Sequence, residues 1–298
     1  MIVCVGEILL ELEICKDPYA FNFVGVPGGD TFIVASDISL IGGDACFYGV
    51  VGEDYFGKYL IQKAKDYPLK SLHIFTTKHA NTTLLVSYAD EEEKQSELIR
   101  SPGADSLFDK DLKLSIHKGD IVHFGSFLLS NKKGRVVINS FIKQIKKAGC
   151  LSSFDVNLKL DLYENKIEAR NVYLSALKEF DIIKMSEEEF LFLARNQKVG
   201  NFYKTYLKKD ALLFITKGVN GSVCYYKTRS YEATCLPLNM VDPSGAGDAF
   251  FARCLVELDS RPHKNNFDDV NFSNLLTDAN IDGAEATQYK GALKQMPK

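Results

Sequence analysis

The sequence lacks a strong excess of charge of either sign, with 36 Lys and Arg side chains against 39 Asp and Glu. A formal net charge of −3 gives no reason to expect nucleic acid or an anionic membrane as a partner. The chain also has no uncharged apolar run long enough to cross a bilayer, and Glu7 interrupts the apolar N-terminal stretch. Because no basic segment precedes that stretch, we expect no signal peptide.

Cysteines and histidines at metal-ligand spacing are also missing. The seven cysteines include no C-x-x-C pair, and the five histidines include no H-E-x-x-H. An odd number of scattered thiols is typical of a reducing compartment and not of a disulfide framework or a zinc site. We therefore expect a cytoplasmic protein.

What the chain does contain is a core-forming composition, with 46% hydrophobic residues among 298. Short apolar runs that predict buried strands alternate with segments of helical period, an order that predicts a mostly parallel sheet with helices on both faces. The predicted strands lie at 1–6, 45–52, 120–126, 151–157, 180–186 and 211–218, and predicted helices at 54–67, 131–149 and 165–180.

Two stretches, 10–26 and 81–100, break this alternation. Their patterns predict antiparallel strands, with a charged turn at Asp90–Lys94 in the second. Both flank the segment PGGDTF. We interpret them as a small β lid over the sheet, and an ordinary edge hairpin is the alternative. No repeat or linker divides the chain, so we expect one domain over residues 1–298.

Polar residues gather where three of the predicted strands end. In open α/β sheets, ligands bind in the crevice beyond the carboxyl ends of the strands. Any one group would be explained as a loop, but three groups together favour a single cleft. The groups are Asp155 with Asn157, Lys184 with Ser186 and Glu189, and Thr216 with Lys217 and Gly218.

The segment VDPSGAGDAF at 241–250 lies just before an apolar run of helical period. Glycines let the backbone approach another group closely, and free N–H groups at a helix start favour anions such as phosphate. Asp248 would stand in the first turn, where a carboxylate can take the proton of an attacking hydroxyl. Helix capping alone is the alternative role for Asp248. No G-x-x-x-x-G-K-[ST] occurs, which excludes a P-loop kinase.

This segment is similar to a signature usually written D-T-x-G-A-G-D, and eight further segments follow the order of the same family. Together they resemble the PfkB, or ribokinase-like, carbohydrate kinases across the whole chain. The segments are GEILLEL (6–12), GVPGGDTFIVA (25–35), IGGDACFYGVVGEDYFGKYL (41–60), LIRSPGAD (98–105), FDVNLKLDLY (154–163), KMSEEEF (184–190), ITKGVNGS (215–222) and ANIDGAEATQYKGALKQMP (279–297).

The resemblance implies a three-layer ribokinase-like α/β fold with a β lid that covers the sugar and often builds a homodimer. It implies that Asp248 is the catalytic base and that Gly245, Ala246 and Gly247 form the anion hole. The implied sugar-binding residues are Glu11, Gly28, Gly29, Asp30, Arg100, Asn157 and Lys159. For Arg100, an ion pair with Asp105 is the alternative.

The resemblance also implies ATP and magnesium as cofactors, with potassium in many members. Glu189 matches the residue that holds magnesium through water, and a solvated helix start is its alternative role. Asp242, Ser244 and Gly291 match a loop that binds a monovalent cation. The implied nucleotide-binding residues are Lys184, Thr216, Gly218, Gly221 and Asn280.

Four positions depart from the family pattern. Ile33 stands where the sugar segment usually has Asn, so a sugar hydroxyl there would lose a partner. Pro243 replaces a Thr, Val156 replaces a Pro, and Lys159 stands where fructokinases have Arg, which loses the bidentate fork. Segments 98–105 and 154–163 resemble fructokinases, whereas the N-terminal motifs resemble 2-keto-3-deoxygluconate kinases.

We therefore expect an ATP-dependent kinase that phosphorylates a primary hydroxyl of a monosaccharide. Fructose is the first choice and 2-keto-3-deoxygluconate the second. A nucleoside kinase of the same fold and a sensor that binds sugar or nucleotide without turnover are the alternatives.

Overall fold

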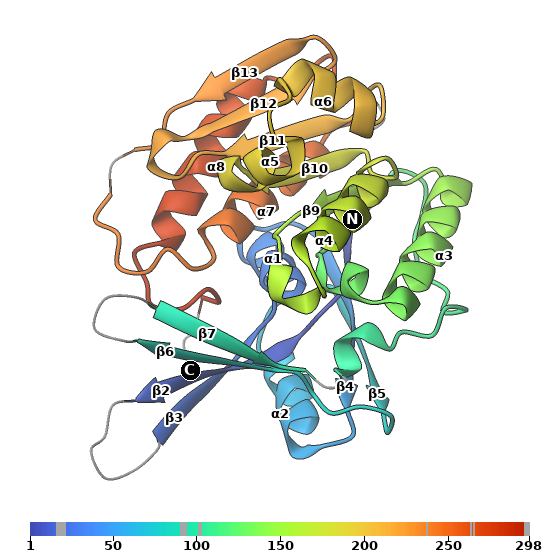
Figure 1. Ribbon diagram of the computed structural model, residues 1–298, viewed down its shortest axis with the longest axis vertical. Coiled ribbons are helices and arrows are strands. Elements are labelled where there is room, and N and C mark those ends of the chain that lie inside the picture. Colours follow the sequence, from blue (N-terminus) through green and yellow to red (C-terminus); the bar gives the residue numbers. More distant parts are fainter. Residues whose placement is uncertain are drawn as a thin grey trace.

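The computed structural model describes residues 1–15, 22–89, 94–100, 103–236, 238–262, 264 and 266–294. Within these ranges the chain forms a nine-stranded sheet in the order β13-β12-β11-β10-β9-β8-β1-β4-β5 (Figure 1). The strands are β1 (Ile2–Val5), β4 (Ala45–Gly52), β5 (Ser71–Thr77), β8 (Ile121–Phe124), β9 (Leu151–Asp155), β10 (Ile182–Ser186), β11 (Leu212–Thr216), β12 (Ser222–Tyr226) and β13 (Arg229–Ala233).

The sheet is parallel from β5 to β11 and antiparallel only where β12 and β13 join its edge. All six strands that the sequence predicts are present, and the mostly parallel sheet is confirmed. The sequence analysis did not predict β5, β12 and β13, which lie at the two ends of the sheet.

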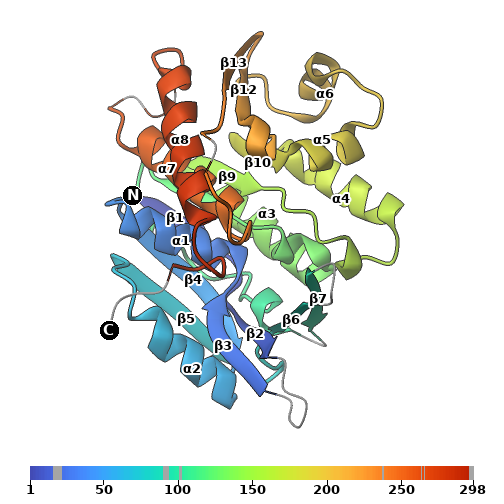
Figure 2. The ribbon, with the colours of Figure 1, turned by 90° about the vertical axis from the view of Figure 1, so that its left-hand side faces the viewer.

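Helices cover both faces of the sheet, which gives three layers (Figure 2). Alternate residues of β1 point to opposite faces: Ile2 and Cys4 join one core cluster, and Val3 and Val5 join the other. The first cluster is covered by α1 (Asp30–Leu40), α2 (Tyr55–Ala64), α7 (Ala246–Asp259) and α8 (Phe272–Ala286). The second is covered by α3 (Lys132–Ala148), α4 (Lys166–Leu177), α5 (Glu187–Ala194) and α6 (Val199–Tyr206).

The predicted helices begin and end where the capping residues stand. Asn131 accepts a hydrogen bond from the Gly134 N–H at the start of α3, and Gly149 ends α3 in the left-handed conformation. Asp54 caps α2 in the same way. Single 3₁₀ turns occupy Ala104–Ser106, Phe127–Ser130, Leu160–Leu162 and Gly218–Asn220.

A second, four-stranded sheet, in the order β3-β2-β6-β7, is present where the lid is predicted, and we refer to it as the lid. Its strands are β2 (Leu9–Cys15), β3 (Asn22–Gly28), β6 (Leu84–Ala89) and β7 (Lys94–Ile99). The antiparallel pairs β2–β3 and β6–β7 match the two predicted stretches, and a parallel β2–β6 pairing joins them. This sheet is separate from the nine-stranded one, so the edge-hairpin alternative is wrong. The predicted turn at Asp90–Lys94 lies largely outside the described residues.

Across the described ranges, we find no helix of the length and apolarity that a bilayer crossing requires. Six cysteines in those ranges are free thiols: Cys4, Cys46, Cys150, Cys224, Cys235 and Cys254.

Candidate active site

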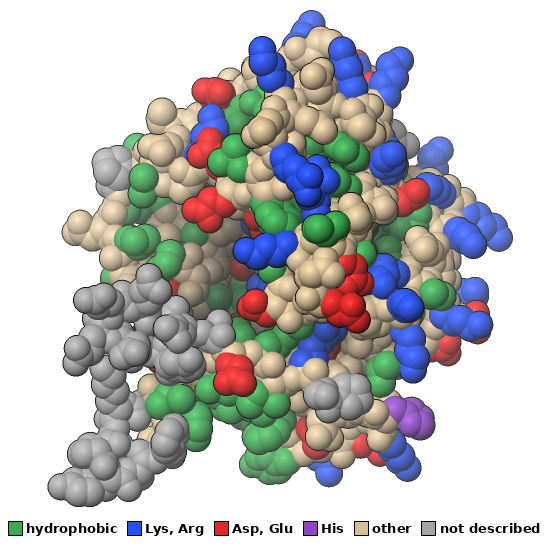
Figure 3. Space-filling model, in the orientation of Figure 1, with side chains coloured by type: hydrophobic (Ala, Val, Ile, Leu, Met, Phe, Trp, Pro, Cys, Tyr) green, Lys and Arg blue, Asp and Glu red, His purple; other side chains and the backbone are tan. Residues whose placement is uncertain are grey.

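A cleft of about 890 Å³ lies between the lid and the carboxyl ends of the central strands. Figure 3 shows a hollow above the lid with acidic and basic side chains around it. The three polar groups predicted from the strand ends all contribute to the cleft wall. The lining residues are Glu11, Asp30, Ile33, Leu85, Ser87, Asn157, Lys184, Ser186, Glu187, Glu188, Glu189, Thr216, Lys217, Gly218, Val219, Asn220, Ser244, Gly245, Gly247, Asp248 and Ala292.

The glycines of the predicted anion hole stand at the start of α7. Gly245 is the residue before the helix and has a φ of 80°, which favours glycine. A Cβ at Gly245 would lie 2.6 Å from the Ala292 carbonyl oxygen, and a Cβ at Gly247 would lie 2.7 Å from Lys184 Nζ. The absence of side chains therefore allows the backbone at the start of α7 to pack closely beside the cleft.

Asp248 lies in the first turn of α7 and lines the cleft, although it is only 7% exposed. The residue before the helix is Gly245, so no side chain caps α7. Burial raises the pKa of Asp248 well above its ordinary value, the nearby Asp30 and Asp155 raise it further, and Lys184 opposes them. This placement suits a proton acceptor better than a helix cap.

A buried ion pair lies behind the anion hole. Lys184 on β10 donates to Asp155 on β9, with 2.9 Å between Nζ and Oδ2. Burial alone would lower the pKa of Lys184, but Asp155, Asp248 and Glu189 raise it above its ordinary value. Burial raises the pKa of Asp155 to about 6 despite Lys184. The predicted nucleotide residue Lys184 therefore lines the cleft with its ammonium already held by a carboxylate.

The predicted sugar residues come from the lid and from the start of α1. Gly28 has no room for a Cβ because the Glu11 carboxylate occupies that space, and Gly29 has a φ of 102°. Asp30 follows as the first residue of α1, and its carboxylate lies 3.0 Å from Lys159 Nζ. Asn157 lines the same cleft with a positive φ of 28°.

Arg100 forms the ion pair that was its alternative role. Its guanidinium donates two hydrogen bonds to Asp105 and one to Ser130 Oγ. Arg100 is not among the residues that line the cleft. Its predicted contact with sugar stays a prediction, and the structure shows only that Arg100 joins β7 to the following turn.

The predicted nucleotide residues divide between two neighbouring places. Thr216 and Gly218 line the main cleft. Gly221 has a φ of 89°, and the Ala233 carbonyl oxygen occupies the space that a Cβ would need. Asn280 lies in an adjacent pocket, where its side-chain amide donates to the carbonyl oxygens of Ala233 and Thr234. Asn280 thus fixes the end of β13 beside the cleft.

The acidic start of α5 fits a magnesium ion that arrives with nucleotide. Glu189 Oε2 accepts from the Ser186 N–H in a capping box, and Oε1 accepts from the Leu158 N–H at 2.6 Å. No cluster of three potential metal-ligating side chains occurs in the part of the chain that the structure describes. Magnesium is usually held by one or two carboxylates, waters and substrate phosphates, so this arrangement fits water-mediated binding.

The predicted cation loop is assembled around Asp242. Its Oδ1 accepts from the Ser244 N–H and its Oδ2 accepts from the Gly291 N–H, both at 3.0 Å. These bonds bring together the three residues that the sequence assigns to a monovalent cation. The assignment itself stays a prediction.

Glu7 is a fully buried carboxylate near Asp30 that was not among the predicted site residues. Its Oε1 accepts from the N–H and the hydroxyl of Thr31, whereas its buried Oε2 has no partner within the described residues. Burial raises the pKa of Glu7 to about 8, and Asp30 adds to the effect. An acidic residue inside an otherwise apolar run was the signal that could have identified it.

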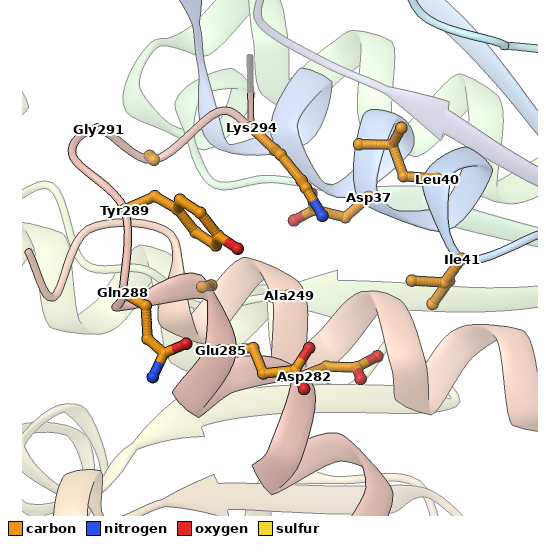
Figure 4. Close-up of a pocket in the computed structure, with 12 residues that line it drawn as sticks. Asp37, Leu40, Ile41, Ala249, Asp282, Glu285, Gln288, Tyr289, Gly291 and Lys294 are labelled. Atoms are coloured by element: carbon orange, nitrogen blue, oxygen red, sulfur yellow. The ribbon is translucent and has the colours of Figure 1, made fainter. Parts of the chain in front are cut away.

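A smaller pocket of about 290 Å³ lies behind the cleft, between α1, α7, α8 and residues 288–294 (Figure 4). Asp37 and Lys294 approach each other at one end, and Asp282 and Glu285 of α8 line the other. Burial raises the pKa of Asp37 to about 7, with Asp282 adding to the effect. Ala292 lines both this pocket and the main cleft.

A three-layer α/β fold with glycines and a buried carboxylate at one helix start is the arrangement expected of a ribokinase-like phosphotransferase. The pfkB family carbohydrate kinase profile matches residues 1–298. The chain belongs to the pfkB family of carbohydrate kinases and is an enzyme that transfers a phosphoryl group to a sugar hydroxyl.

Known relatives support the same conclusion. The chain is 33% identical to a probable chloroplastic fructokinase-6 of Arabidopsis thaliana, covering 99% of this chain and 79% of that protein. It is 30% identical to a fructokinase of Vibrio alginolyticus, covering 91% and 88%. Fructokinase of Vibrio cholerae O395, solved with fructose, ADP and calcium ion, superposes with a TM-score of 0.87 at 26% identity, covering 98% and 94%. A double mutant of that protein was solved with fructose, ADP and potassium ion.

Proposed function

We propose that this enzyme is a fructokinase that transfers the γ-phosphoryl group of ATP to a primary hydroxyl of fructose. The single observation that carries the proposal is the placement of Asp248 beside the glycine-rich backbone of residues 245–247 at the start of α7, in a cleft whose opposite wall is the lid. The relatives that are about 30% identical to this chain are named fructokinases, and a fructokinase of the same fold is solved with fructose and ADP.

The proposed mechanism is an in-line transfer that relies on position and charge. Asp248 accepts the proton of the sugar hydroxyl as that oxygen attacks the terminal phosphorus. Burial and the nearby carboxylates raise the pKa of Asp248, which makes its carboxylate a stronger proton acceptor. The N–H groups at the start of α7 stabilise the negative charge on the transferring group. Closure of the lid over the sugar excludes water from the reaction.

The charges on the sugar side favour a neutral sugar over the sugar acid 2-keto-3-deoxygluconate. Glu11 and Asp30 line the cleft there, and Lys159 is already paired with Asp30. Arg100 is paired with Asp105 in the same way. A substrate carboxylate would therefore meet carboxylates and no uncommitted cation among these residues. Fructose carries no charge, and its hydroxyl groups can donate to carboxylate acceptors.

Ile33, which stands in place of the usual Asn, is compatible with fructose because its side chain can make an apolar contact with the sugar. Ile33 is 1% exposed and lines the cleft beside Asp30, and Leu85 of the lid strand β6 lines it as well. These two side chains offer methyl groups where the usual Asn would offer an amide. A sugar carbon, and not a hydroxyl, is expected to face this position.

Magnesium and potassium complete the proposal. Magnesium would neutralise phosphate charge, held by the nucleotide and by Glu189 through water. Potassium would occupy the loop of Asp242, Ser244 and Gly291 and steady the segment before the anion hole. Calcium and potassium are named in the solved fructokinase structures, and these assignments to this chain rest on the donor atoms described above.

Two further parts of the proposal concern assembly and location. The lid exposes Val24 and Ile99, with exposed fractions of 52% and 51%, which suit a homodimer formed lid to lid. The six free thiols support a cytoplasmic location, since such thiols persist in a reducing compartment.

The test of the function is Asp248→Asn assayed beside the wild type with MgATP and a panel of fructose, 2-keto-3-deoxygluconate and ribosides. We expect the wild type to phosphorylate fructose with the highest kcat/KM. Loss of the base should lower kcat by about 10²–10⁴-fold. Near-normal turnover by the variant would contradict the assigned base.

The same panel separates the alternatives. A preference for ribosides would favour a nucleoside kinase, and a preference for the sugar acid would refute the charge argument. Sugar binding without ATP consumption by the wild type would favour the sensor.

A further inference from the structure

We infer that Lys184, anchored by Asp155, is the positioning residue that keeps the Asp248 carboxylate in its proton-accepting form and fixes a positive charge directly behind the anion hole. This inference rests on the proposed role of Asp248 as the base.

The two anchoring residues are paired by the register of the sheet. Lys184 on β10 and Asp155 on β9 are direct cross-strand partners. The Lys184 side chain is 8% exposed and the Asp155 side chain 2% exposed. Since the strands hold both backbones and the 2.9 Å ion pair holds the side chains, the ammonium has one fixed position.

The missing side chain of Gly247 allows the ammonium to reach the anion hole. A Cβ at Gly247 would lie 2.7 Å from Lys184 Nζ and 3.4 Å from Cε. Any larger residue would push the ammonium away from α7. Lys184 Nζ therefore sits against the backbone of the residue that immediately precedes Asp248.

The charges that face Asp248 show why one cation is needed there. Carboxylates approach from α1 and β9, and each of them disfavours a second ionised carboxylate. Of the groups that influence Asp248 most strongly, Lys184 supplies the opposing charge. Lys159 also interacts electrostatically with Asp248, but its ammonium is paired with Asp30. The facing groups are Asp30, Asp37 and Asp155, opposed by Lys184.

Removal of Lys184 should therefore change how Asp248 titrates. Asp155 would lose its partner at the same time, so one buried carboxylate near Asp248 would stand without compensation. The carboxylates near Asp248 favour its protonated form, which cannot accept the proton of the sugar hydroxyl. The enzyme should then need a higher pH to reach its full rate.

The test compares pH profiles of kcat/KM and kcat for four proteins: wild type, Lys184→Met, Lys184→Arg and Asp155→Asn. ATP titrates identically in every assay, so differences between variants report on the protein. In the pH profile of Lys184→Met, we expect the acidic limb, where the rate rises with pH, to shift to higher pH by one unit or more. Its loss of rate at pH 6 should be about tenfold greater than its loss at pH 9. Lys184→Arg keeps the charge and should restore the limb toward the wild-type position.

The variant Asp155→Asn should shift the acidic limb of the pH profile in the direction opposite to Lys184→Met. It removes one facing carboxylate and keeps the cation, so its acidic limb should move to lower pH than in the wild type. This variant keeps the inference falsifiable if Lys184→Met does not fold, which circular dichroism and ADP binding would show. An unmoved or raised limb in Asp155→Asn would overturn the inference.

The remaining outcomes separate this inference from the proposed function. An unmoved limb in folded Lys184→Met, with a higher KM for ATP, would mean that Lys184 only contacts nucleotide. The inference would then fail, while an inactive Asp248→Asn would still support the proposed function. Near-normal activity in Asp248→Asn would overturn both.

Discussion

Gly245 shows how one residue can decide the geometry of the whole site. Its left-handed backbone turns the chain into α7, and the Ala292 carbonyl oxygen occupies the space beside it. Both requirements exclude a side chain at Gly245, which lines the cleft just before α7.

Gly245→Ala should therefore damage activity more than stability. A left-handed alanine costs about 1 kcal/mol, and the clash with Ala292 would displace the amides from the phosphate position. We expect kcat to fall by about 10²-fold, as for the loss of an oxyanion donor. Gly42→Ala is a matched control, because Gly42 also has a positive φ but has open space around it. Equal kcat losses in the two variants would contradict this account.

The residues of the site differ in how far the sequence alone could identify them. Gly245 to Asp248 are predictable because the glycines, the acid and the apolar helix pattern are adjacent in the chain. The pairs Lys184–Asp155 and Glu7–Thr31 are 29 and 24 residues apart, and strand register and helix packing bring them together. No local pattern encodes such contacts, although the position of Glu7 inside an apolar run did mark it as an unusual acid.

At the scale of the element, the sequence predicted the strands of the lid but not the helix α1. The helix α1 was not predicted because it is buried on almost every side and so shows no polar stripe. The lid strands were predicted because they alternate and stand outside the helical rhythm. Their pairing into a separate sheet depends on the parallel β2–β6 contact between distant segments, which the sequence does not specify.

The lid also carries the prediction about assembly. We expect the wild type to sediment as a dimer, and Val24→Lys to shift it toward monomer by placing a charge on an exposed apolar position. Val136→Lys is the matched control, since Val136 is 53% exposed but lies on α3. Analytical ultracentrifugation at micromolar concentration gives the result. A monomeric wild type, or an equal effect of both variants, would refute assembly through the lid.

At the scale of the whole molecule, buried acids make stability depend on pH. Burial raises the pKa of Glu7 to about 8, of Asp37 to about 7 and of Asp155 to about 6. Between about pH 4 and their folded-state pKa values, these three groups therefore bind more protons in the folded protein than in the unfolded chain. The stabilising effect of these protonated groups is complete at low pH and disappears as the pH rises through each folded-state pKa.

Glu7→Gln tests this dependence, because glutamine keeps an acceptor for Thr31 and has no proton to lose. We expect the Tm of the wild type to fall between pH 5 and pH 8.5, and that of the variant to fall less. The two proteins should be similar at pH 5, and the variant should be several degrees more stable at pH 8.5. A constant difference in Tm across this range would show that Glu7 does not titrate as described.

The most direct measurement is a crystal structure of the enzyme with fructose and a non-hydrolysable ATP analogue. The account predicts the terminal phosphate at the amides of residues 245–247 and a primary sugar hydroxyl within hydrogen-bond distance of the Asp248 carboxylate. A terminal phosphate bound elsewhere, or an Asp248 carboxylate turned away from the sugar, would contradict it.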